Sequence, residues 1–174
     1  MRNKFGFSLI ELMVVVGIIL VLTGIGSYSI NRFIQVNKII ELRDYLSSRI
    51  KLAKNLSITN QLPDESVNLS FVKVTISSDN ELIVEGIKKD EDGGLNGTTE
   101  PPYFSVDLEV NEGTTIVLTN NSNVVRSFGF SSKNGRLTDG DGNFSDGPLV
   151  VKLTNESEEC GLTISELGII NNDD

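Results

Sequence analysis

The sequence predicts an α+β protein in which a long N-terminal helix packs on a C-terminal antiparallel β-sheet head. Three observations predict this fold. Residues 12–30 carry no charged side chain, residues 31–60 repeat apolar side chains at the spacing of one helix face, and residues from 67 onward alternate apolar and polar side chains. The alternation recurs in short runs separated by turn residues, so we expect about eight short strands in the head.

The apolar N-terminal run is long enough to cross most of a bilayer core as a helix. Residues 12–30 are 19 positions without a charge, and extension back to Phe7 gives 24 positions in which Glu11 is the only charged one. A cleaved signal peptide is disfavoured, because the chain holds a single alanine and residues 24–26 form a weak cleavage site. A plain signal anchor explains the length but leaves an unpaired carboxylate at bilayer depth, which is costly.

The stretch "KFGFSLIELMVVV" accounts for the glutamate. A short basic segment ends in Gly6, an aromatic residue follows at Phe7, and Glu11 is the fifth residue counted from Phe7. This pattern resembles the N-terminus of type IV pilins and type II secretion pseudopilins. The resemblance implies a leader over residues 1–6, cleavage by a prepilin peptidase between Gly6 and Phe7, methylation of the new Phe7 amine, and a membrane and assembly helix over residues 7–30.

The resemblance also implies a role for Glu11 in assembly. A lone carboxylate inside apolar packing is costly and a paired one is tolerable, so Glu11 is expected to pair with the Phe7 amine of a neighbouring subunit. The expected partners are other pilin or pseudopilin subunits, the prepilin peptidase and an inner-membrane assembly platform. The expected location is the inner membrane, crossed once with the head outside the cytoplasm, and then the pilus or pseudopilus.

Residues 31–60 predict an amphipathic stem helix that ends near Asn60, before Pro63. Its apolar positions are Ile39, Leu42, Leu46, Ile50, Ala53 and Leu56. Its basic positions are Lys38, Arg43, Arg49, Lys51 and Lys54. The apolar stripe is expected to pack on the sheet of the head, and the basic face is expected either to be solvated or to meet the acidic heads of neighbouring subunits.

Residues 61–174 predict the globular head. The predicted strands cover residues 67–76, 81–87, 103–110, 114–119, 124–130, 148–154, 162–165 and 168–171. The alternation slips at Phe71 and Val72, which indicates a bulge or a strand covered on both faces. Residues 111–113 predict a hairpin between the third and fourth strands. Residues 88–102 have no apolar period and predict a loop.

The last third of the chain shows a second resemblance. Residues 128–170 contain a strand, a turn at residues 133–136 that ends in Gly-Arg, an alternating strand, and a last hairpin whose turn at residues 165–168 ends in glycine. This order is similar to the C-terminal part of H-type minor pseudopilins and FimT-like minor pilins. The resemblance implies a minor component of the fibre.

The stretch "DGDGNFSDG" is the candidate metal site of the head. Its hard oxygen ligands would be Asp139, Asp141, Asn143 and Asp146, which suit calcium. An EF-hand is rejected, because Phe144 stands where the loop needs glycine and Val150 where it needs glutamate. The alternative is a glycine-rich turn whose Asp and Asn side chains bond the backbone. Residues 90–92 form a second acidic cluster with the same ambiguity.

Composition argues against catalysis and against nucleic-acid binding. The chain has no histidine, and residues 57–174 carry 21 acidic and seven basic side chains, which repel phosphate. The single cysteine, Cys160, lies beside Glu158 and Glu159, which should raise its pKa. We therefore expect a non-enzymatic structural subunit, and cleavage after Gly6 is the test of this expectation. The alternative is a membrane-anchored extracytoplasmic domain that binds calcium or a glycan and enters no fibre.

Overall fold

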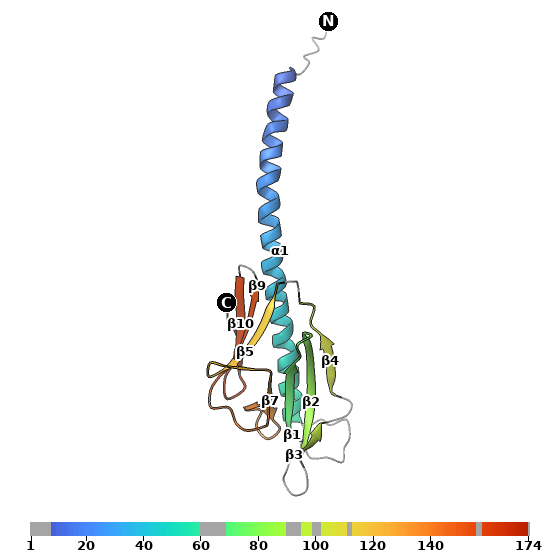
Figure 1. The fold of residues 1–174 in the computed structure, drawn as a ribbon, viewed down its shortest axis with the longest axis vertical. Helices are drawn as coiled ribbons and strands as arrows, with labels where there is room; N and C mark the ends of the chain where they lie inside the picture. The colour runs from blue at the N-terminus through green and yellow to red at the C-terminus, as the bar shows by residue number, and fades with distance from the viewer. Residues whose placement is uncertain are drawn as a thin grey trace. The chain divides into compact units, whose positions relative to one another are not determined.

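The computed structural model describes residues 8–59, 69–89, 95–98, 102–110, 113–155 and 158–173. These residues form one helix, α1 (Leu9–Thr59), and eleven strands (Figure 1). The chain divides into two units, Met1–Lys38 and Ile39–Asp174. No helix among the described residues is long and apolar enough to cross a membrane. The predicted α+β class is confirmed, and α1 ends one residue before the expected stop at Asn60.

The eleven strands form two antiparallel sheets. The first sheet contains β1 (Leu69–Ile76), β2 (Glu81–Lys89), β3 (Leu95–Thr98), β4 (Phe104–Asp107), β7 (Ser127–Ser131) and β8 (Leu137–Asp139). Its order is β3-β2-β1-β7-β8, with β4 also paired to β2. The second sheet contains β5 (Thr115–Asn120), β6 (Asn123–Val125), β9 (Leu149–Asn155), β10 (Glu158–Ile164) and β11 (Ile170–Asp173), in the order β11-β10-β9-β5-β6.

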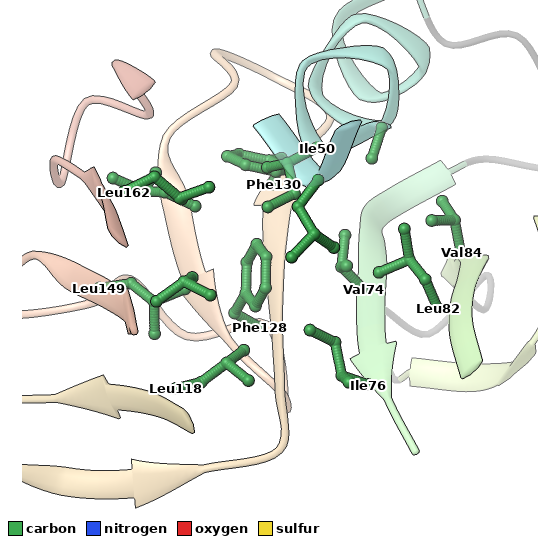
Figure 2. Packing of buried hydrophobic residues seen from close by; sticks show 14 of the residues in the cluster. Ile50, Val74, Ile76, Leu82, Val84, Leu118, Phe128, Phe130, Leu149 and Leu162 are labelled. Carbon is green, nitrogen blue, oxygen red and sulfur yellow. The ribbon is translucent and has the colours of Figure 1, made fainter. Parts of the chain in front are cut away.

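The apolar stripe of α1 fills the space between the two sheets. Leu46, Ile50 and Ala53 are fully buried, as the spacing of apolar residues predicted. Figure 2 shows Ile50 next to Phe130, with side chains of both sheets around them. The rings of Phe128 and Phe130 meet edge to face, with their centroids 5.8 Å apart. Because each buried Leu, Ile or Phe side chain contributes about 1.5–3 kcal/mol, this helix face holds the two sheets on one core.

The slip in the pattern of β1 is a bulge with a large side chain on each face. The register to β2 shifts between Leu69 and Phe71, and Phe71 and Val72 are both buried. Val72 belongs to the central core. Phe71 lies under Gly142, where an added Cβ would be only 2.5 Å from the ring. The glycine-rich loop after β8 therefore covers Phe71, and both readings of the slip are confirmed.

Three details of the predicted head are wrong. The segments expected to form a hairpin across residues 111–113 lie in different sheets, since β4 pairs with β2 and β5 pairs with β9. The loop expected over residues 88–102 contains the end of β2 and all of β3. Eleven strands replace about eight, because β3 and β8 have too few apolar side chains to show a period, and the strand predicted over residues 124–130 is divided at Arg126 into β6 and β7, which lie in different sheets.

The two turns singled out in the C-terminal third contact each other. Gly135 and Gly168 have φ values of +64° and +72°, which favour glycine. The Gly168 N–H donates to the Ser165 carbonyl at 2.7 Å and closes the last hairpin. An added Cβ on Gly168 would lie 2.3 Å from the carbonyl oxygen of Gly135. The glycines therefore serve both the turn conformations and the close approach of the two turns.

Gly168→Ala should lower the free energy of unfolding by about 3 kcal/mol or more, because it combines a left-handed backbone with a backbone clash. The matched control is Gly97→Ala, since Gly97 has nearly the same φ of +73° and no atom within 4 Å of its added Cβ. Only the conformational cost of about 1 kcal/mol should remain there. Denaturant unfolding of both variants checks this, and equal losses would contradict the contact between the turns.

Candidate functional site

The first part of α1 exposes apolar side chains on every side. Large apolar residues from Leu9 to Leu22 are all about half exposed or more, with Leu9 at 77% and Leu20 at 68%. A helix that is apolar all round needs apolar surroundings, from lipid or from other helices. Thr23 fits this character, because its hydroxyl donates to the Ile19 carbonyl at 2.7 Å within the helix. This surface is the strongest candidate for function in the described residues.

Glu11 has a local partner at the start of this helix. The Ser8 N–H donates to Glu11 Oε2 at 3.0 Å, and the Glu11 N–H donates to Ser8 Oγ at 3.4 Å. These reciprocal bonds are a capping box, which satisfies backbone donors that the first turn leaves unpaired. The sequence carries the signal for this capping box as Ser-x-x-Glu, a spacing that the prediction for Glu11 did not use. Gly6 and Phe7 lie outside the described residues.

The basic face of the stem is largely used inside the head. Arg43 is buried, and its Nη1 donates to the Asp173 carbonyl at 3.2 Å. Lys54 Nζ donates to the Gly168 carbonyl at 2.8 Å. The Arg49 guanidinium lies 4.9 Å from the centroid of the Tyr45 ring and 5.7 Å from that of Phe104. These three cations therefore contact the helix's own head, and a contact of the basic face with neighbouring subunits stays a prediction.

A buried hydroxyl adds a further anchor that the sequence pattern did not show. Ser57 is fully buried, and its Oγ lies 2.9 Å from the Phe130 carbonyl oxygen and 2.8 Å from that of Ser131. One O–H is thus shared between two carbonyls of β7. The last turn of α1 is held to the first sheet by this contact.

The predicted calcium loop forms a turn organised by Asp139. Its Oδ1 accepts the N–H groups of Asp141 and Asn143, each at 2.9 Å, and its Oδ2 accepts from Asn143 Nδ2 at 3.1 Å. Asp146 makes no such bond within the described loop and is exposed. No group of three acidic, His or Cys side chains suited to a metal occurs among the described residues. Calcium binding stays a prediction, and it would compete with the bonds of the turn. Residues 90–92 lie outside the described residues.

Cys160 is half-buried beside the stem helix. Its Sγ lies 3.8 Å from the Ile39 carbonyl oxygen. Burial raises the pKa of the Cys160 thiol, while Arg43 lowers it and Asp44 raises it. The raised pKa agrees with the prediction, but its main cause is burial and not Glu158 and Glu159. The thiol is a packing group in this environment.

Comparison with known proteins gives one match, at the N-terminus. Residues 1–27 match the prokaryotic N-terminal methylation motif, and this range includes Gly6, Phe7 and Glu11. The motif marks prepilins of the type IV pilin and pseudopilin kind. It implies a membrane-anchored precursor that a prepilin peptidase processes and that assembles with other pilin subunits. No curated protein and no solved structure matches the chain. The similarity of residues 128–170 to H-type and FimT-like proteins stays a prediction.

Asp139→Ala should destabilise the head by about 1–3 kcal/mol, equally in calcium and in a chelator, because it removes the acceptor of three hydrogen bonds. Asp146→Ala is the matched control and should be nearly neutral in both conditions. Thermal unfolding of the two variants with calcium and with chelator checks this. If calcium stabilises the unchanged chain and both substitutions abolish that effect, the main role of Asp139 is not to organise the turn. That result would support a metal site.

Proposed function

We propose that this protein is a non-enzymatic, minor structural subunit of a type IV pilus or of a type II secretion pseudopilus. The observation that carries the proposal is the prepilin motif over residues 1–27, joined to a helix whose apolar side chains from Leu9 to Leu22 have no partner within the described chain. Such a surface is stable when it is covered by lipid before assembly and by neighbouring helices afterwards. The head then lies outside the cytoplasm and forms the surface of the fibre.

Glu11 acts in this proposal as a registration point between subunits. Cleavage after Gly6 creates an amine at Phe7, and the Glu11 carboxylate of a neighbour pairs with it in apolar surroundings. The capping box supports this role, because the Ser8 N–H already bonds Glu11 Oε2 and lowers the cost of the carboxylate before assembly. The carboxylate has a second oxygen, so one group can hold the cap and accept the amine.

The assignment to a minor subunit rests on the C-terminal third. The two glycine turns at residues 133–136 and 165–168 follow the order seen in H-type and FimT-like proteins, and they contact each other through Gly135 and Gly168. The single cysteine cannot form the intrachain disulfide loop found in many major pilins. Both features favour a minor subunit.

Processing should convert the precursor into a chain that begins with N-methylated phenylalanine at residue 7. Intact mass and N-terminal sequencing of the membrane fraction check this, with a Gly6→Leu variant as the unprocessed control. Retention of Met1 in the unchanged chain would contradict the pilin function and favour a membrane-anchored binding domain. Cleavage after Gly26 would indicate an ordinary signal peptide.

Glu11→Ala should be processed normally but fail to enter fibres, with a loss of at least about tenfold in incorporation, because it leaves the Phe7 amine of the next subunit unpaired in apolar surroundings. Ser8→Ala is the matched variant: it breaks the capping box at a cost of about 1 kcal/mol to the helix start but keeps the carboxylate. Quantitative immunoblotting of sheared fibres checks both. Equal defects in the two variants would assign the role of Glu11 to helix capping alone.

A further inference from the structure

Half of β5 has an unpaired edge. The register pairs β6 only with residues 118–120 of β5, from Leu118 opposite Val125 to Asn120 opposite Asn123. Residues 115–117 pair with β9 on one side and with no strand on the other side within the described chain. The reason lies at Arg126, where the chain leaves the second sheet and its carbonyl accepts the Ile76 N–H of the first sheet at 3.1 Å.

The unpaired edge presents backbone groups that can bond a further strand. Asn121 and Ser122 have φ values of +47° and +69° and form a two-residue hairpin turn, so Asn120 and Asn123 are a hydrogen-bonded pair. Backbone groups alternate along a strand, which directs those of Leu118 toward Val125 and those of Ile116 toward the vacant edge. In the registers of the described strands, Ile116 has a partner in β9 and none on this edge.

A cleft lies along this edge. Its volume is about 400 Å³, and it is bounded by the end of β1 and the following turn, by β5, and by residues 124–126. Ile76 and Leu118 are both buried beside it, and Figure 2 shows them on opposite sheets. Thr114 also lines the cleft, and its hydroxyl oxygen is buried without a hydrogen-bond partner in the described structure. The cleft thus combines an apolar floor with unpaired polar groups.

We infer that this cleft accepts one extended strand of a neighbouring fibre subunit, which continues β6 and pairs with residues 115–117 of β5. Three strand residues extend about 10 Å. The residue opposite Ile116 faces the core and should be aliphatic, while its neighbours face outward and should be polar or β-branched. The exposed Arg126 side chain lies where this strand begins, so an acidic residue is expected there. The identity of the partner as a fibre subunit rests on the proposed function.

The test of the cleft itself uses the full-length chain in detergent micelles and a probe peptide, acetyl-Glu-Thr-Val-Thr-amide. Amide exchange measured by NMR should show a fast Ile116 amide in the chain alone and at least about tenfold protection at saturating peptide. The amides of Thr115 and Val117 face β9 and serve as internal controls, with no change. A peptide with an N-methylated valine should give no protection. An Ile116 amide already protected in the free chain, or unaffected by the peptide, would overturn the inference.

Two further measurements separate the partner from the proposed function. Arg126→Glu should lower the affinity for the acidic probe peptide about fivefold and raise the affinity for a peptide with lysine in place of glutamate. Unchanged affinities for both peptides would refute the acidic residue predicted beside Arg126. In fibres, Val124→benzoylphenylalanine should crosslink to another subunit, because Val124 is 73% exposed beside the cleft. Fibres that contain the chain without this crosslink overturn the inference and leave the function intact. Absence of the chain from fibres overturns the proposed function. The peptide titration then still tests whether the cleft binds an extended strand.

Discussion

Burial of one face of α1 between two sheets is the contact on which the head depends. A sheet with one apolar face must cover it, and here both inner faces are covered by the same helix stripe. Leu46, Ile50 and Ala53 are fully buried at this junction. Truncation of a buried Leu or Ile side chain such as Leu46 or Ile50 typically costs about 2–5 kcal/mol, which is a large share of the stability of a domain of this size.

The polar anchors around this stripe explain why the stem is so basic. An acidic head favours cations on the helix that packs against it. Arg43 and Lys54 bind backbone carbonyls of the last hairpin, and Arg49 lies against two aromatic rings. Arg43, Arg49 and Lys54 thus orient the helix within its own head, and the apolar part of α1 is the main surface for assembly in the proposed fibre.

The periodic parts of the chain were predictable, and the non-local parts were not. The stripe of α1 and the start of the prepilin motif follow from local spacing, so they were found correctly. The partners of β4 and β5 depend on which distant strand each one meets, and residues 111–113 carried a turn signal that fits a hairpin and a crossing between sheets equally well. The capping box at Ser8 is visible in the sequence as the three-residue spacing between Ser8 and Glu11. The shared hydroxyl of Ser57 and the cover of Phe71 by Gly142 had no local pattern to reveal them.

The last hairpin carries a further consequence of its two bonds to α1. Arg43 and Lys54 are separated by 11 helix residues, which rise about 16 Å. Gly168 and Asp173, whose carbonyls they bind, are five residues apart across the end of the last turn and β11, which extend at most about 16 Å. The spacing of the two cations along the helix therefore matches the spacing of the two carbonyls along the last hairpin. A slip of β11 by one residue along β10 would reverse the faces of its side chains and would displace the carbonyls that Arg43 and Lys54 bind, so the helix supports the register that the turn at residues 165–168 sets.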